Sequence, residues 1–247
     1  MRRLPLAVVV PTFALVAVGC SDASAPLSPD PSSLGGASFA RPAAGPAVNG
    51  IITAGEYDGG ATVTFPVSLP AGGTSTATVS FRHDRTDLYM AVTFDRGSAF
   101  HQNDIVGIEF DNDDDGIRED GDDLVLSGWL PELNRAYDGG DWYRFNNGND
   151  NGPDDFDGGT QEVTQAYGVI GTRGTFEMRH DLDSDDNAHD FSIDPMRGTQ
   201  TVGFIVQVSL ENEPAGVNTY VHSFKPSFTT YCRLTIGKKT TAISCPA

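Results

Sequence analysis

The 247-residue chain has few positive charges, few cysteines and little continuous hydrophobic sequence. Its 16 Lys and Arg residues face 34 Asp and Glu residues, which gives a formal net charge of −18 at pH 7. This excess of negative charge argues against nucleic acid or a bare anionic membrane as a partner, and it favours cations. The apolar run of residues 4–18 is too short to span a bilayer stably, and no second apolar stretch is long enough to do so.

The usual catalytic motifs are also missing from the sequence. It contains no Gly-x-Ser-x-Gly, no His-Glu-x-x-His and no phosphate-binding loop. The many carboxylates gather in turn-like segments, where bound cations and solvent account for them better than an acid–base pair does. We therefore predict that the chain is not an enzyme.

The first residues are typical of an export signal. Arg2 and Arg3 precede an apolar run that ends in small residues before Cys20. The sequence Ala17-Val18-Gly19-Cys20 resembles a bacterial lipobox, which implies that Cys20 is acylated after residues 1–19 are removed. The alternative is ordinary signal cleavage that leaves a free thiol. We expect an exported protein that is lipid-anchored at the cell envelope, with Ser21 favouring the outer membrane or cell surface.

Residues 20–46 are mostly Ser, Ala, Pro and Gly and are predicted to form a flexible tether. Residues 47–247 remain for one folded domain. Within it, Cys232 and Cys245 flank two strand-like segments, 233–236 and 240–244. The midpoint of the two cysteines falls between Lys238 and Lys239. A hairpin turning there would place the cysteines opposite each other, so we predict a disulfide.

From Val48 onward the hydrophobic period is two rather than 3.6. In segment 87–95, for example, Leu88, Met90, Val92 and Phe94 share one face. No segment has a convincing amphipathic helical pattern, so the sequence predicts an all-β protein, an antiparallel β-sandwich of jelly-roll or immunoglobulin-like type with long acidic loops. The predicted strands are 61–69, 77–82, 87–95, 104–110, 123–129, 142–146, 161–170, 175–180, 199–210, 219–224, 228–236 and 240–244.

The most distinctive acidic loop follows strand 104–110. Carboxylates alternate at its start, and Gly116 permits a sharp turn behind them, as in calcium-binding loops. The closing residue is Asp instead of the usual bidentate Glu, and the flanking segments are strands. We predict a calcium site here, the alternative being a solvated acidic turn. The candidate ligands are Asp111, Asp113, Asp115, the carbonyl of Ile117, Glu119 and Asp122.

Two further acidic loops are weaker candidates for a second metal site. Segment 181–190 alternates Asp181, Asp183 and Asp185 but has no glycine at its sixth position. Segment 146–159 carries several aspartates among Asn and Gly. Segments of either kind are more often solvated loops than metal sites.

Four segments together resemble a known group of domains: 48–57, 83–89, 104–116 and 177–190. They are similar to the family 9 carbohydrate-binding modules and the wider DOMON-like group, which includes haem-binding members related to ethylbenzene dehydrogenase. The resemblance spans residues 47–225. It implies a β-sandwich with a ligand face, bound calcium in many members, and either sugar or haem as ligand.

Sugar binding requires an exposed aromatic surface with polar neighbours, and one segment offers both. The candidate ligand-binding residues are Trp129, Tyr137, Asp141, Trp142 and Arg144. The alternative is that either Trp packs in the core. Haem is the less favoured ligand, because Met178 and His180 face the same way on one strand and cannot clamp a haem from both sides, while Met90 lies in an apolar stripe.

These observations predict a lipid-anchored, non-catalytic, calcium-binding domain outside the cytoplasm that binds a polysaccharide or cell-surface glycan. Two alternatives stay open. One is a calcium-stiffened surface or structural protein without a small ligand, and the other is a haem-binding DOMON-like electron-transfer domain.

Overall fold

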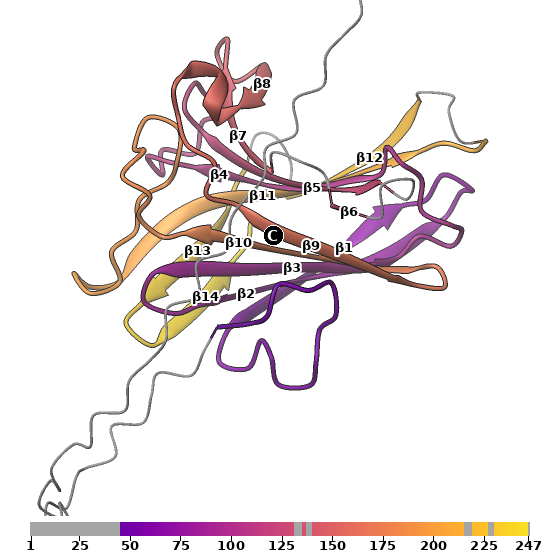
Figure 1. The fold of residues 1–247 in the computed structure, drawn as a ribbon, viewed down its shortest axis with the longest axis horizontal. Coiled ribbons are helices and arrows are strands. Elements are labelled where there is room, and N and C mark those ends of the chain that lie inside the picture. Colours follow the sequence, from indigo (N-terminus) through magenta and orange to yellow (C-terminus); the bar gives the residue numbers. More distant parts are fainter. Residues whose placement is uncertain (1–44, 131–134, 137–139, 215–218, 227–229, 247) are drawn as a thin grey trace, which may run out of the picture. The chain divides into compact units, whose positions relative to one another are not determined.

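A computed structural model describes residues 45–246, except 131–134, 137–139, 215–218 and 227–229. Two antiparallel β-sheets pack face to face as a sandwich (Figure 1). The described residues contain no α-helix and one short 3-10 helix, η1 (Asp154–Asp157). None of their helices is long and apolar enough to cross a membrane. The predicted all-β sandwich is therefore confirmed.

The first sheet has five strands in the order β1-β2-β3-β10-β9. Every pair is antiparallel, and β3 and β10 run together from Asp87↔Asp181 to Asp95↔Arg173. The bounds are β1 (Ala61–Ser68), β2 (Thr74–His83), β3 (Asp87–Asp95), β9 (Thr164–Ile170) and β10 (Arg173–Asp181).

The second sheet has the path β14-β13-β11-β4-β5-β7-β8, with β12 also paired to β11 and β6 to β5. The long strand β11 is the centre of this sheet, because its first half pairs with β13 and its second half with β12. The bounds are β4 (Ile105–Asp111), β5 (Asp123–Leu130), β6 (Arg135–Ala136), β7 (Asp141–Phe145), β8 (Asp150–Pro153), β11 (Gln200–Glu211), β12 (Tyr220–Lys225), β13 (Cys232–Gly237) and β14 (Thr240–Ser244).

The core between the sheets follows the predicted alternation. Leu88, Met90, Val92 and Phe94 of β3 are fully buried, and Met178 of β10 pairs with Met90 across the sheet. Burying a large apolar side chain stabilises the fold by roughly 1.5–3 kcal/mol. Both methionines are therefore accounted for as core packing.

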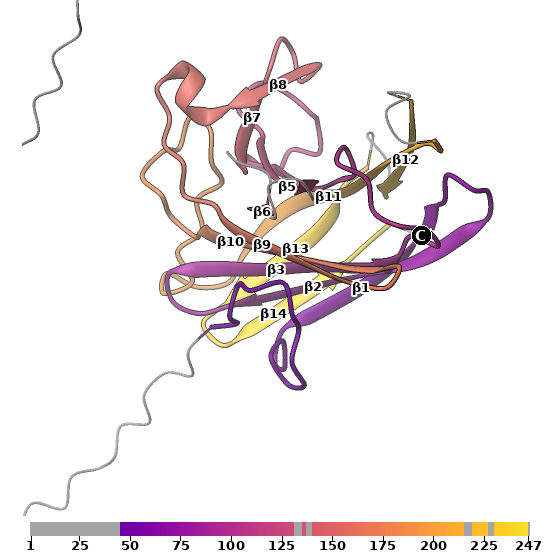
Figure 2. The same cartoon turned by 45° about the vertical axis from the view of Figure 1, so that its right-hand side comes forward.

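The outer face of the five-stranded sheet is covered by residues 45–60, the indigo segment beneath the sheet in Figure 2. Glu177 of β10 fixes this segment, because its Oε2 accepts hydrogen bonds from the backbone nitrogens of Asn49 (3.1 Å) and Gly50 (2.7 Å). Gly45 lies directly against the ring of Tyr89. This cover explains why both faces of β3 are buried.

Most predicted strands lie within a few residues of the observed ones, and β3 and β14 match at both ends. Strand β8 and the two-residue β6 were not predicted. The sequence of β8, Asp-Asn-Gly-Pro, has no apolar alternation, and it forms a strand only because β7 supplies a partner for its backbone.

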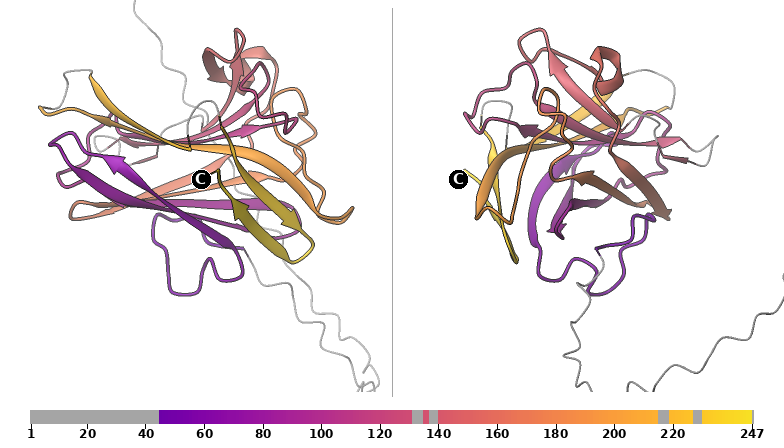
Figure 3. Two further views of the ribbon diagram at one scale, coloured as in Figure 1. Left: turned by 180° about the vertical axis from the view of Figure 1, so that it is seen from behind. Right: turned by 60° about the vertical axis from the view of Figure 1, so that its left-hand side comes forward.

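The C-terminal hairpin has the predicted register. Gly237 pairs with Thr240, so Lys238 and Lys239 form the turn. Cys232 and Cys245 are joined by a disulfide, with their Cα atoms 4.2 Å apart. The predicted disulfide is confirmed. Figure 3 shows the hairpin, in yellow, beside the first strands of the other sheet.

Replacing both Cys232 and Cys245 by Ser should lower the free energy of unfolding by about 3 kcal/mol, because the bridge closes a loop of about that entropic value in the unfolded chain. Urea denaturation of the domain under non-reducing conditions measures the change. Labelling of both thiols in the folded, unreduced wild type, or an unchanged urea midpoint in the double variant, would contradict the bridge.

Candidate buried cation centre

A cluster of charged side chains lies at one end of the sandwich, where β10 ends and β5 and β7 begin. Phe176, Met178 and His180 alternate inward along β10, so the imidazole of His180 continues the apolar stripe into the interior. Asp123 starts β5, Asp141 starts β7, and Asp190 comes from the loop after β10. The ligand atoms of His180 and these three aspartates all lie within 4.8 Å of one another.

The distances from Nε2 of His180 to the nearest carboxylate oxygens are too long for good hydrogen bonds. They are short enough for one atom to contact both the nitrogen and the oxygens. Its Nε2 lies 3.6 Å from Asp141 Oδ1, 3.6 Å from Asp190 Oδ1 and 3.8 Å from Asp123 Oδ2. Its Nδ1 lies 2.5 Å from the carbonyl oxygen of Asp181. Since a carbonyl only accepts, Nδ1 carries the proton in this contact, and a neutral His180 therefore presents the lone pair of Nε2 to the carboxylates.

The polar atoms of the cluster are buried without hydrogen-bond partners in the protein. They are Nε2 of His180, Oδ1 of Asp141, and both carboxylate oxygens of Asp123, Asp154 and Asp190. A single buried polar atom left unpaired costs about 1–3 kcal/mol, and more if it is charged. Buried charges in proteins are paired or coordinate metals, and this set of atoms could hold a metal ion.

Burial and mutual repulsion shift the pKa values of these groups strongly. Burial raises the pKa of Asp123 well above its ordinary value. Burial, with the nearby charges of Asp141 and Asp190, raises the pKa of Asp154 to about 9. Burial lowers the pKa of His180, but the negative charges around it outweigh that effect and hold the pKa well above its ordinary value.

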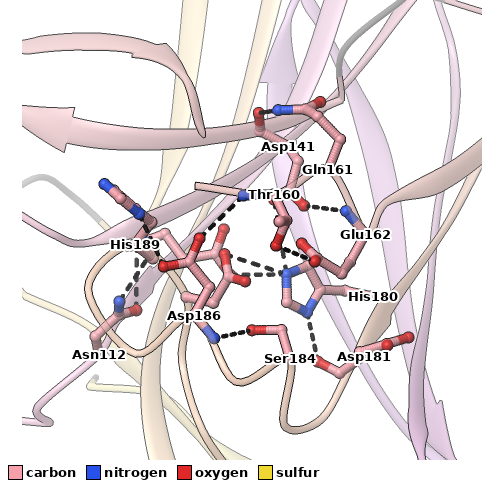
Figure 4. A network of polar contacts seen from close by, with 12 residues as sticks. Asn112, Asp141, Thr160, Gln161, Glu162, His180, Asp181, Ser184, Asp186 and His189 are labelled. Carbon is pink, nitrogen blue, oxygen red and sulfur yellow. Dashed lines mark hydrogen bonds and ion pairs between the residues drawn. The ribbon is translucent and has the colours of Figure 1, made fainter. Parts of the chain in front are cut away.

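Hydrogen bonds from neighbouring loops hold the surroundings of the cluster in place (Figure 4). Asp141 Oδ2 accepts from the backbone nitrogen of Glu162 at 2.7 Å. Asp186 accepts from the backbone nitrogen of Thr160 at 3.0 Å and lies 2.9 Å from Nδ1 of His189. The network therefore fixes the orientation of the groups that face His180.

Asp190 also belongs to a second convergent group, with Asp154 of η1 and Asp186. Asp154 and Asp190 are buried, and Asp186 is partly exposed. The two groups share the carboxylate of Asp190, so within the described residues a second group of acidic side chains lies next to the first. Both Asp154 and Asp186 come from the weaker acidic loops of the sequence, 146–159 and 181–190.

The loop predicted to bind calcium brings three of its candidate ligands together. Ligand atoms of Asp111, Asp113 and Asp115 lie within 4.8 Å of one another. Asp111 is buried and accepts hydrogen bonds from the backbone nitrogens of Asp115 (3.2 Å) and Gly116 (2.8 Å). Burial, with the charges of Asp113 and Asp114, raises the pKa of Asp111 to about 6.

The other candidate ligands of this loop have different surroundings. Asp122 is buried at the base of the loop, where it accepts from the backbone nitrogens of Glu119 (3.0 Å) and Asn112 (3.3 Å). Burial raises its pKa to about 7. The side chains of Glu119 and Ile117 are exposed. The carboxylate of Asp122 thus closes the loop by accepting from backbone nitrogens, and it lies outside the convergent group.

The alternating aspartates of segment 181–190 are not brought together. Asp181 ends β10 and lies across the sheet from Asp87, Asp183 accepts from Ser192, and Asp185 is exposed. Period two is a property of strands, and β10 ends at Asp181, so the alternation does not continue into the loop. The loop instead contributes Asp186 and Asp190.

The predicted sugar-binding residues lie in several environments. Asp141 belongs to the buried cluster, and Arg144 is buried against Glu109, with Nε 3.1 Å from Oε2. Trp142 is half-buried on β7. The side chain of Trp129 and residue Tyr137 lie outside the described residues.

The sequence pattern did not predict one site that combines His180, Asp123, Asp154 and Asp190. A usable signal was present for His180, because a polar side chain in register with Phe176 and Met178 must face the interior. The contributions of the other three depend on pairing between distant strands and loops, which no local pattern reports.

The chain is similar to two solved structures. No family model and no curated protein matches the chain. A family 9 carbohydrate-binding module from Caldicellulosiruptor kristjanssonii, solved with cellotriose, has a TM-score of 0.46 and 15% identity over 73% of this chain and 78% of that one. The module solved with glucose has a TM-score of 0.41 and 15% identity, over 69% of this chain and 76% of that one.

The raised pKa values predict an unusual pH dependence for the cation-free protein. The folded chain binds more protons than the unfolded chain between the ordinary Asp pKa of about 3.9 and the folded pKa of Asp154, about 9. Stability in chelator should therefore fall as the pH rises through this range. Calorimetric melting at about pH 5 and about pH 8 tests the sign. A chelated protein that melts higher at the alkaline pH would contradict it.

Proposed function

We propose that the chain is a non-catalytic binding module whose β-sandwich is held together at one end by a divalent cation coordinated by His180, Asp123, Asp141 and Asp190. The observation that carries this proposal is the Nε2 atom of His180, fully buried without a hydrogen-bond partner and facing three carboxylate oxygens.

The spacing of these atoms suits ligands of a single ion. Zinc–ligand bonds to His nitrogen and carboxylate oxygen are about 2.0–2.2 Å long, which places neighbouring ligands of a tetrahedron roughly 3.3–3.6 Å apart. The three distances from Nε2 of His180, 3.6, 3.6 and 3.8 Å, fall at or just beyond that range. A small inward movement of the side chains would complete the coordination.

The surroundings of His180 also support a metal ligand. Ligating histidines usually donate their second ring N–H to a carbonyl or carboxylate, which fixes the tautomer and the ring orientation. The contact between Nδ1 of His180 and the carbonyl of Asp181 is of this kind. Asp141 is held in turn by the backbone of Glu162.

The donor atoms distinguish two kinds of cation. Calcium takes oxygen ligands, whereas imidazole suits zinc and other transition metals. We therefore propose a transition-metal ion of the zinc type at His180 and calcium at Asp111, Asp113 and Asp115. In the buried centre His180 and Asp123 are completely inaccessible to solvent and Asp190 is 2% exposed, so the ion has no face open to a substrate. Its proposed role is structural.

Two further parts of the proposed function rest on the sequence. We propose that the module binds a carbohydrate, with half-buried Trp142 of β7 as the described aromatic residue of that surface, and that Cys20 anchors it to a membrane through lipid. The two alternatives to a carbohydrate-binding module are a cation-stiffened structural protein without a small ligand and a haem-binding domain.

Zinc added to chelated protein should raise its melting temperature, because a cation that binds only the folded state stabilises it by about 2.7 kcal/mol at a hundredfold excess over Kd. His180→Ala should abolish the shift. His222→Ala is the matched control, since His222 is exposed on β12. Calorimetry with zinc, manganese and calcium in separate titrations measures the effect.

Asp123→Asn gives a second test that keeps the shape of the side chain, in case His180→Ala fails to fold. Elemental analysis of the purified protein should find about one transition-metal ion per wild-type chain at this centre and less in Asp123→Asn. If the melting temperature of the wild type is the same with chelator and with each metal, the proposal is wrong.

The calcium loop can be tested separately. Asp113→Ala with Asp115→Ala should remove the stabilisation by calcium, expected at about 10⁻⁴–10⁻³ M, and leave the zinc effect unchanged. Asp183→Ala with Asp185→Ala removes the same charge from an exposed loop and serves as control. Equal loss of the calcium effect in both double variants would show nonspecific attraction to acidic loops instead of a site.

A further inference from the structure

A separate pocket of about 530 Å³ lies beside the C-terminal hairpin and the β2–β3 turn. Its lining is unusual for so acidic a chain, because four cationic side chains face it: Arg82, Arg85, Lys238 and Lys239. Lys238 and Lys239 are two of the only three lysines in the sequence. The pocket therefore concentrates positive charge in a chain whose net charge is −18.

The four cations are not neutralised by ion pairs within the described residues. The ion pairs found there use other arginines, such as Arg96, Arg118 and Arg144. Arg82 donates to the backbone carbonyl of Glu56, which carries no net charge.

Two carboxylates line the same pocket, Asp58 and Asp84. The Asp84 carboxylate is already engaged, by the backbone nitrogens of Thr86 and Asp87 and by the hydroxyl of Tyr89. Four cationic side chains against two carboxylates leave a formal charge of +2 at the pocket, before any contribution from His83. The pocket therefore attracts an anion.

The positions of the cations are set by the framework. Lys238 and Lys239 form the two-residue turn between β13 and β14, and the open end of that hairpin is closed by the disulfide of Cys232 and Cys245. Arg85 lies in the β2–β3 turn, which the hydrogen bonds of Asp84 organise. A preorganised set of cations loses little freedom when a ligand binds.

We propose that this pocket binds the carboxylate of a sugar acid, such as a hexuronate at the end of a glycan. The four cations would hold the acid group, while Asp58 and Thr241 offer partners for hydroxyls, and Pro195 and Met196 offer apolar surface to the C–H face of a sugar ring. The volume lies within the range of about 300–1,000 Å³ that is usual for small-molecule sites. A polyanion is disfavoured by the charge of the whole chain.

This proposal rests on the carbohydrate part of the proposed function and does not require the proposed metal ions. Titration calorimetry with glucuronate, glucose and sulfate, all at low ionic strength, tests it. Glucuronate should bind at least about tenfold more tightly than glucose, because charge-assisted hydrogen bonds are roughly twice as strong as neutral ones. Added salt should weaken the binding.

Lys238→Ala with Lys239→Ala should weaken glucuronate binding at least about tenfold. The control is Lys225→Ala with Arg173→Ala, which removes the same charge from residues outside this pocket and should have little effect. The turn lysines are exposed, so the variant is expected to fold, and a cooperative thermal melting transition of the same sample verifies this.

Sulfate binding as tightly as glucuronate supports an oxyanion site and limits it to the anion itself. Glucuronate and glucose binding equally, no binding of glucuronate, or equal weakening in both double variants would overturn the inference. If a neutral oligosaccharide still binds in those cases and Trp142→Ala removes that binding, the carbohydrate proposal stands and only the pocket assignment falls.

Discussion

The fold depends on how the sandwich accommodates buried negative charge at the end of β10. Asp123, Asp141, Asp154 and Asp190 are buried near one another, with one imidazole among them. If ionised, these carboxylates would repel strongly in the low-dielectric interior, and desolvation adds to that penalty. Protons or a cation must therefore replace the missing partners. The proposed cation reconciles this end of the molecule with a stable apolar core immediately beside it.

The cluster also connects the loops at this end of the sandwich. Three of its aspartates stand on loops or at the first residue of a strand, and they come from segments that are far apart in the sequence. Interactions at one centre therefore restrain the starts of β5 and β7, the helix η1 and the loop after β10 at once. Such a cross-link between distant segments resembles the effect of a disulfide, which restricts the unfolded chain.

The strands of the β-sandwich could be predicted from the sequence, but the buried cluster around His180 could not. Alternation in β3 and the cysteine spacing of the last hairpin are local properties, and both were read correctly. The convergence of Asp111, Asp113 and Asp115 was also predicted, because these residues are close in the chain. In contrast, Asp123 and Asp141 meet through the pairing of β5 with β7, and His180 arrives from the opposite sheet. The strand β8 depends on its partner in the same way.

The proposed cation and the proposed anion pocket share one segment of chain. Asp190 belongs to the buried cluster, while Pro195 and Met196, five and six residues later, line the pocket. Between them Ile193 is buried, and its nitrogen donates to the carbonyl of Leu182 at 2.6 Å, which holds the segment against the end of β10. A cation that fixes Asp190 would restrain this wall of the pocket as well. Ordering the wall in advance would reduce the entropy lost on ligand binding, so a buried structural ion can strengthen a ligand site that it does not touch.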